Sequence, residues 1–224
     1  PFQKVNHYKI VLNNSMIISQ GTLKSVFGYQ LNERKEFAEI TSPDDYGLYF
    51  KLSTFNYELK YHFPEYKKIN FTTGLNGMLQ NSLNKGTEYL VPAYTLFDGG
   101  IFAIAARNFN KIDVSAGIRY DTRKLNGEDL YLDANGISTN ENNAAEHRFK
   151  SFSTTFSGLT GSAGMAWNFN PNFYTKANLS FGFRAPNIAE LGANGVHEGT
   201  IRYEIGNTQL KAEKSRQVDL SLGF

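Results

Sequence analysis

A polar segment near the end of the chain carries the residues best suited to bind a charged ligand. They are Arg184, Glu190, His197, Glu198, Arg202 and Tyr203. A guanidinium group forms paired, charge-assisted hydrogen bonds with an anionic ligand, and the ring of Tyr203 can stack on a ligand ring. The alternative interpretation is internal: Arg184, Glu190 and Glu204 form ion pairs with one another and fix the segment in place.

The other reactive side chains do not form a recognisable catalytic or metal-binding motif. The chain has four histidines, and no two of them have ligand-like spacing on one element: His7, His62, His147 and His197. Cysteine is absent, which excludes disulfides, thiolate metal sites and cysteine nucleophiles. Glu190 and Glu198 are candidates for an acid–base pair, but no nucleophile accompanies them. We therefore predict no catalytic residue, no metal site and no cofactor, and we do not expect an enzyme.

The composition restricts the class of protein. The chain has 224 residues, 41% of them hydrophobic and 14% aromatic, and its mean hydropathy is −0.41. No apolar run approaches the roughly 18 to 20 residues that a transmembrane helix needs. The net charge is +2, and acidic and basic residues are interspersed, so we expect no nucleic-acid partner.

Apolar and polar residues alternate along most of the chain, which is the pattern of half-exposed β-strands. Nine strands are expected, at about residues 7–19, 22–38, 48–63, 69–80, 101–107, 112–121, 155–168, 173–184 and 218–224. In the third strand the apolar phase slips near Ser53 and Thr54, which indicates a bulge or the point where the strand leaves a bilayer. A soluble sheet with one wet face also alternates in this way.

The connections between these strands alternate between short and long. The short ones are SQG, PEYKK, NFNK and NPN, and the longer ones cover residues 41–47, 81–100, 125–147 and 185–214. Bacterial outer-membrane barrels have short periplasmic turns and longer extracellular loops. Aromatic residues cluster near the short turns, as in an interfacial girdle: Tyr61, Phe63, Trp167, Phe169 and Phe173. We therefore predict an all-β fold, an antiparallel transmembrane β-barrel in which one row of each strand faces lipid.

The odd number of strands indicates that this barrel is partial. Bacterial single-chain barrels have even strand numbers, and an open sheet edge cannot lie in hydrocarbon. We expect residues 1–224 to be part of a larger barrel domain whose other strands are absent from the sequence.

Several segments resemble TonB-dependent receptors of bacterial outer membranes. The strand–turn–strand run ending in GYQLNERKEF is similar to their mid-barrel repeat, and LNGMLQNSLNKGTEYLVPAYTLFDGGIFA and AGIRYDTRKL are similar to later segments. The most specific match is FRAPNIAELGANGVHEGTIRYEIGN, followed by the spaced residues Leu210, Glu213 and Ser215.

This resemblance implies a 22-stranded barrel in the cell outer membrane, plugged by an N-terminal domain and driven by TonB. Of these strands the sequence contains about nine, and it contains neither the plug domain nor the segment that contacts TonB. The implied ligand is a scarce small molecule, such as a ferric siderophore, haem, cobalamin or an oligosaccharide.

Because the segment from Arg184 to Glu204 belongs to the family-wide motif, we favour its internal ion pairs over ligand contacts. Ligand contacts are then expected mainly from residues 81–100 and 125–147. The lumen-facing cations are expected to contact the plug or water: Lys24, Lys60, Arg119, Lys176 and Arg184.

Two other classes of protein remain open at this point. One is a passive outer-membrane channel or an adhesin of another barrel family. The other is a soluble β-sandwich or carbohydrate-binding module, whose closed core would bury Phe27, Phe71, Leu179, Phe181 and Leu220.

Overall fold

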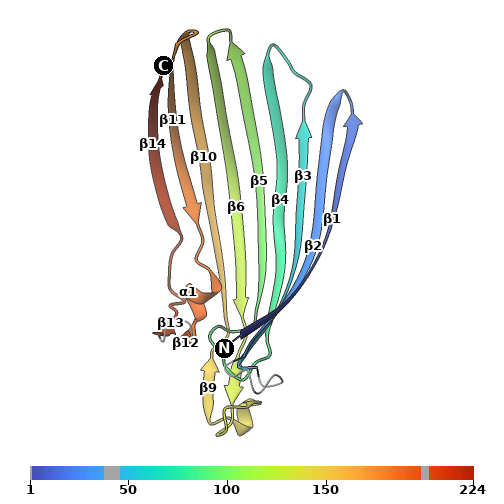
Figure 1. The fold of residues 1–224 in the computed structure, drawn as a ribbon, viewed down its shortest axis with the longest axis vertical. Helices are drawn as coiled ribbons and strands as arrows, with labels where there is room; N and C mark the ends of the chain where they lie inside the picture. The colour runs from blue at the N-terminus through green and yellow to red at the C-terminus, as the bar shows by residue number, and fades with distance from the viewer. Residues whose placement is uncertain (1, 38–45, 198–201) are drawn as a thin grey trace.

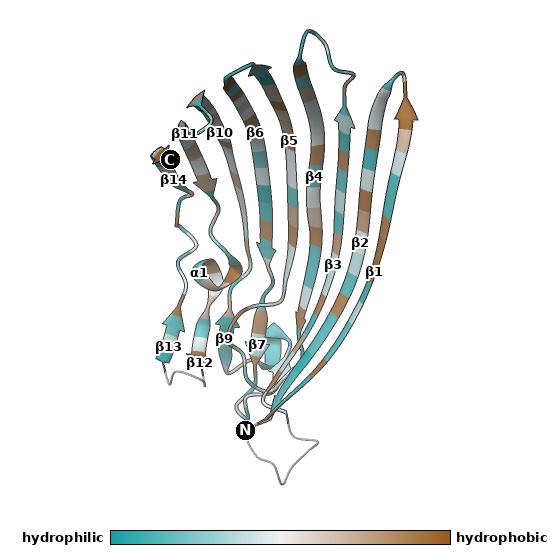
Figure 2. Cartoon of the chain, turned by 45° about the horizontal axis from the view of Figure 1, so that its top comes forward, coloured by the Kyte–Doolittle hydropathy of each residue, from teal (hydrophilic) through white to brown (hydrophobic). Residues whose placement is uncertain are grey.

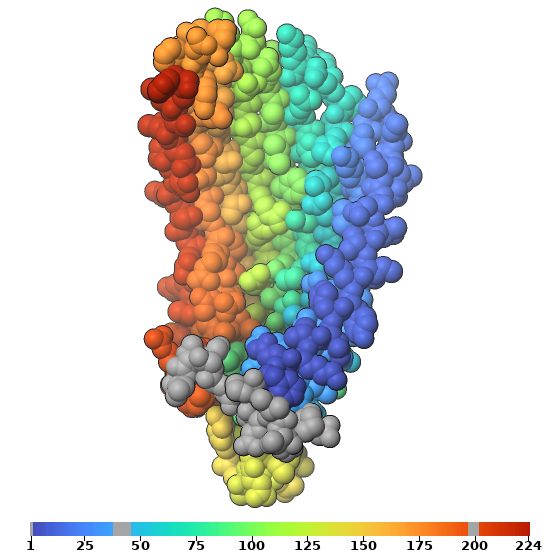
Figure 3. All heavy atoms as spheres, in the orientation of Figure 1, coloured from blue at the N-terminus to red at the C-terminus, as the bar shows by residue number. Residues whose placement is uncertain are grey.

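In the computed structural model, which describes residues 2–37, 46–197 and 202–224, nine long antiparallel strands form one sheet (Figure 1). The strands follow one another in chain order: β1 (Phe2–Ile18), β2 (Gly21–Phe37), β3 (Leu48–His62), β4 (Ile69–Asn84), β5 (Tyr94–Phe109), β6 (Ile112–Gly127), β10 (Phe152–Asn170), β11 (Phe173–Arg184) and β14 (Glu213–Gly223). The sheet is curved and open, with β1 and β14 at its two edges (Figures 1 and 3). The predicted nine strands are confirmed.

Cross-strand pairing sorts the side chains into an apolar face and a polar face. Leu12 pairs with Phe27 and Phe27 pairs with Tyr57, so the apolar rows of neighbouring strands coincide. The alternation is visible along the strands in Figure 2. Leu179 is 59% exposed and Leu220 is 80% exposed, so no second layer covers the apolar face within the described residues. The β-sandwich interpretation, which requires both residues in a closed core, is therefore wrong.

Tight turns join the strands at one end of the sheet. Ser19 and Gln20 both have positive φ (49° and 67°), and so do Lys67 and Lys68 (49° and 63°). Two-residue turns of this kind match the right-handed twist of the strands they join. Aromatic pairs lie close to these turns, with ring centroids 4.6 Å apart for Tyr61–Phe63 and 4.0 Å apart for Trp167–Phe169.

The longer connections gather at the opposite end of the sheet (Figures 1 and 3). Between β6 and β10 lie a small sheet of β7 (Leu130–Leu132), β8 (Ser138–Thr139) and β9 (Glu146–Phe149) and a 3-10 turn (Glu141–Asn143). Between β11 and β14 lie α1 (Ile188–Gly192) and a hairpin of β12 (Asn194–His197) and β13 (Arg202–Ile205). No helix in the described part of the chain is long and apolar enough to cross a membrane.

A small buried core forms where α1 meets the sheet. The hydrophobic residues at its centre are Leu96, Leu125, Phe156, Ala185 and Leu191. Because the three residues from β5, β6 and β10 belong to the polar row, α1 folds onto the polar face near the long-loop end. Leu125 is fully buried and Leu191 is 1% exposed, so this contact is tightly packed.

The prediction of a long loop over residues 81–100 is wrong. β4 continues to Asn84 and β5 begins at Tyr94, and Ser82 pairs with Tyr94. The stretch FDGG belongs to this predicted loop, but Gly100 lies within β5, and its missing side chain leaves room for Arg119 and Asp121. The connection is therefore limited to residues 85–93.

Other strand ends differ more modestly from the prediction. The expected loop at residues 125–147 begins only after Gly127 and contains β7, β8 and the first half of β9. The β2–β3 register runs through Ser53 and Thr54 without a shift, so no bulge explains the change of phase there. Most of the expected loop at 41–47 lies outside the described residues.

Candidate ligand-facing site at the long-loop end

Arg184, the last residue of β11, is held by two carboxylates. Its Nη1 and Nη2 each donate to a Glu190 oxygen at 2.9 Å. Its Nε and Nη2 donate to the two oxygens of Glu213 at 2.9 and 2.6 Å. The internal pairing of Arg184 with Glu190 is present, but the second partner is Glu213 of β14 and not Glu204. The cluster thus joins β11, α1 and β14.

Glu190 is fixed at the first turn of α1. Asn187 caps this helix: its side chain accepts from the Glu190 N–H, and the Glu190 carboxylate accepts from the Asn187 N–H, at 2.9 and 2.8 Å. Such a reciprocal pair satisfies two backbone donors that the helix leaves free. The Arg184 guanidinium, followed by the Asn187 N–H, lowers the pKa of Glu190 from 4.5 to about 2. The carboxylate is therefore charged at neutral pH.

Hydrogen bonds centred on Asn194 lock three connections together. The Asn194 N–H donates to the Leu90 carbonyl at 3.0 Å, and its side-chain amide donates to the Arg148 carbonyl at 2.8 Å. The Tyr203 hydroxyl donates to the Asn194 side-chain oxygen at 2.7 Å. Residues 85–93, β9 and the β12–β13 hairpin therefore form one connected cap.

The structure divides the six predicted ligand-binding residues into separate groups. Arg184 and Glu190 lie together in the ion-pair cluster. The backbone of His197 pairs with Arg202 across the β12–β13 hairpin, and Tyr203 follows in the same strand. Arg202 and Tyr203 are exposed, whereas Glu198 lies outside the described residues.

A second polar cluster lies on the β7–β9 sheet. His147 Nε2 is 2.9 Å from Asp129 Oδ1, and the His147 ring stacks on Tyr131 with centroids 4.1 Å apart. Hydrogen bonds from Ser151, and then from His147, lower the pKa of Asp129. Tyr131 and the imidazole thus form a preorganised aromatic–polar surface in the region where the sequence predicted ligand contacts.

Sequence reasoning missed a row of ion pairs on the polar face below this cap. Arg123 of β6 binds Asp98 of β5 through two bonds of 2.7 Å, and Arg119 donates to Asp121 at 2.6 and 2.8 Å. These groups and Arg184 line a hollow of about 440 Å³. Assigning residues 81–100 to a loop concealed the position of Asp98. The local pattern gives no clear signal, because Leu96, Asp98 and Gly100 share one row of β5 and are apolar, charged and small in turn.

The arrangement provides charged and aromatic groups suited to binding. Within residues 2–37, 46–197 and 202–224, no three histidine, aspartate or glutamate side chains come together as a group that could hold a metal ion.

Solved structures with the same fold are known. One of them is a double mutant of the hemophore receptor HasR of Serratia marcescens, in complex with its hemophore HasA and heme. It matches 98% of this chain with a TM-score of 0.64 and 13% sequence identity. The copper transporter OprC gives a TM-score of 0.68 at 13% identity over 96% of this chain. The FrpB iron transporter of Neisseria meningitidis gives 0.64 at 13% identity over 99%.

The chain spans about a third of the length of these three structures, 36%, 36% and 34% respectively. At such low identity the similarity establishes the fold only. The sequence itself matches the family model described as TonB dependent receptor-like, beta-barrel, over residues 8–224. Together with the two-faced sheet and its segregated turns and loops, this match identifies the chain as a member of the TonB-dependent receptor β-barrel family of the outer membrane.

Proposed function

We propose that the chain forms part of an outer-membrane receptor that actively imports a scarce ligand, such as a ferric siderophore. The observation that carries this proposal is the two-faced sheet, with an exposed apolar row on one side and ion pairs on the other. In a membrane barrel the apolar row contacts lipid and the polar row lines the lumen. The tight turns would then face the periplasm and the cap would face outside.

We propose that residues 1–224 are one segment of a larger barrel domain, about nine strands of an expected 22. In the described residues β1 and β14 lie at opposite edges and do not pair with each other. An unpaired backbone group in hydrocarbon costs several kcal/mol. Further strands of the full-length chain would satisfy both edges.

The ligand class is proposed from the cap and from the related structures. Those proteins are a hemophore receptor in complex with its hemophore and heme, a copper transporter and an iron transporter. In this chain we assign first contact with the ligand to the exposed Arg202, Tyr203 and His147 and to the half-buried Tyr131 that stacks on His147. Haem, cobalamin and oligosaccharides are the other candidates. Arg184 and Glu190 are assigned to positioning, because each already has a charged partner.

The polar face is proposed to receive the plug domain of the full-length protein. Asn76 Oδ1 lines the hollow between the ion pairs and is buried without a hydrogen-bond partner in the described residues. A buried acceptor of this kind is costly unless a donor reaches it. A plug donor would supply that bond, and TonB would act on the plug from the periplasm.

Uptake of radiolabelled ligands by cells with the full-length gene tests this function. Cells with and without the gene, and with and without TonB, are compared for ferric siderophores, haem and cobalamin under iron limitation. Saturable uptake that requires both the gene and TonB supports the proposal. Uptake that requires the gene but not TonB would indicate the alternative passive channel. Surface adhesion without any uptake would indicate an adhesin.

A further inference from the structure

Arg107 occupies an unusual place on the apolar face of the sheet. It lies in β5 between Ile69 of β4 and Val114 of β6, both apolar. In the turn-side half of this face, it is the only charged side chain among the described strand residues. A charged residue on the lipid side of a barrel is destabilising, most strongly at mid-depth and less near the interface, so this position calls for a compensating partner.

The described residues do not supply that partner. Arg107 Nε is buried and has no hydrogen-bond partner, and no carboxylate of the described residues forms an ion pair with this side chain. One face of the guanidinium lies on the Phe109 ring, at 4.4 Å from its centroid. The cation is thus oriented by an aromatic ring, and its hydrogen-bond donors are left free.

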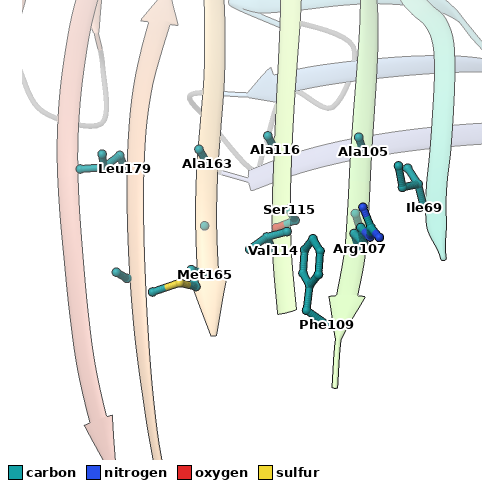
Figure 4. Close-up of a pocket in the computed structure, with 13 residues that line it drawn as sticks. Ile69, Ala105, Arg107, Phe109, Val114, Ser115, Ala116, Ala163, Met165 and Leu179 are labelled. Atoms are coloured by element: carbon teal, nitrogen blue, oxygen red, sulfur yellow. The ribbon is translucent and has the colours of Figure 1, made fainter. Parts of the chain in front are cut away.

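The side chain borders a shallow apolar hollow (Figure 4). Small residues from four neighbouring strands form its floor: Ala105, Ala116, Ala163 and Ala177. Met165 and Leu179 flank it, and its volume of about 540 Å³ falls within the range of roughly 300–1,000 Å³ typical of small-molecule sites. The hollow can therefore accept a flexible hydrocarbon chain.

The depth of Arg107 fits the headgroup region of the periplasmic leaflet. Asn110, in the turn, is three positions further along the chain, which is about 10 Å along the strand and about 7 Å along the membrane normal at the usual tilt. An arginine can extend its charged end by this amount towards the interface.

We propose that this surface binds one phospholipid of the periplasmic leaflet, with its phosphate on Arg107 and an acyl chain in the hollow. Charge complementarity selects this occupant, since a phosphate accepts paired hydrogen bonds from a guanidinium. The inference rests on the proposed function, because it requires the apolar face to lie in the outer membrane.

The test is native mass spectrometry of the full-length receptor in detergent, titrated with phosphatidylglycerol or with diacylglycerol. Wild-type protein should bind phosphatidylglycerol, and Arg107→Gln should weaken this binding roughly tenfold, as expected for loss of a charge-assisted contact. Arg107→Lys should retain most of the binding. Ala163→Trp should fill the hollow and weaken binding similarly, whereas Ser25→Trp adds the same ring to the same face elsewhere and should not. Diacylglycerol, which lacks the phosphate, should bind weakly to every variant.

Equal phosphatidylglycerol binding by wild type and Arg107→Gln would overturn the proposal, and so would unchanged binding by a correctly folded Ala163→Trp protein. Heat-modifiable migration of each variant establishes folding. The uptake assay is run in parallel on the same proteins. Normal TonB-dependent uptake with unaltered lipid binding would reject only the lipid site, whereas a receptor absent from the outer membrane would reject the proposed function.

Discussion

Replacing Leu179 by arginine tests the assignment of faces most sharply. Leu179 lies on the apolar face of β11, between Ala163 and Val218. Six residues separate it from Phe173 at the turn end, which is about 20 Å along the strand and about 15 Å along the membrane normal at a tilt of about 40°. The apolar band of such barrels is about 25 Å tall, so the new charge would lie near mid-depth. Leu179→Arg should therefore lower the free energy of unfolding by about 2–4 kcal/mol.

Asn178→Arg is the matched control, because the neighbouring side chain points to the polar face. Its amide donates to Asp219 at 3.4 Å, so a new guanidinium would meet a carboxylate. We expect a change within about 0.5 kcal/mol, as for most surface substitutions. The assay is equilibrium denaturant unfolding of the full-length protein in phospholipid vesicles. Equal destabilisation by the two substitutions, or a larger effect of Asn178→Arg, would refute the assigned register.

Three further predictions concern the cap. Leu191→Ala removes a fully buried side chain and should cost about 2–5 kcal/mol of local stability, measured by hydrogen exchange of α1, while Leu210→Ala at an exposed position should cost little. Arg184→Gln leaves two carboxylates facing each other and should speed proteolysis of the segment between β11 and β14, whereas Arg202→Gln, with the same loss of charge, should leave the cleavage rate unchanged. Because the pKa of Glu190 is lowered to about 2, its stabilising contribution is complete above about pH 4.5 and is lost as the pH falls towards 2. In the wild type, exchange of α1, corrected for intrinsic rates, should accelerate as the pH falls through that window and stay constant at higher pH. Glu190→Gln lacks the titrating carboxylate and should not show this acceleration.

The strands could be predicted from the sequence because a two-residue period is a local property. The alternation around Phe55, Tyr57 and Leu59 assigns these residues to one face of the strand without information from distant parts of the chain. The short turns could be predicted equally well, since a tight hairpin leaves few residues between two alternating segments. The strand ends at the short turns were therefore predicted to within two residues, whereas the opposite ends of β1, β5, β6 and β14 extend five to seven residues further than predicted.

The cap could not be predicted in the same way, because it depends on contacts between distant segments. Glu213 is 29 residues from Arg184 in sequence, and nothing local distinguishes it from Glu204 as the partner. Gly100 falls in the predicted loop over residues 81–100, although it makes room in the sheet for Arg119. Such assignments require the register of neighbouring strands, which only the assembled sheet provides.

The central claim is that one row of each strand contacts lipid while the opposite row is wet. Spin labels at Phe181→Cys and Val218→Cys in the full-length receptor, reconstituted in lipid, test it directly, and Ser180→Cys reports the opposite face. We predict that oxygen, which partitions into lipid, relaxes the labels at 181 and 218 more strongly than a water-soluble nickel complex does. The label at 180 should show the reverse order. Water-like accessibility at 181 and 218 with lipid-like accessibility at 180 would contradict the membrane assignment.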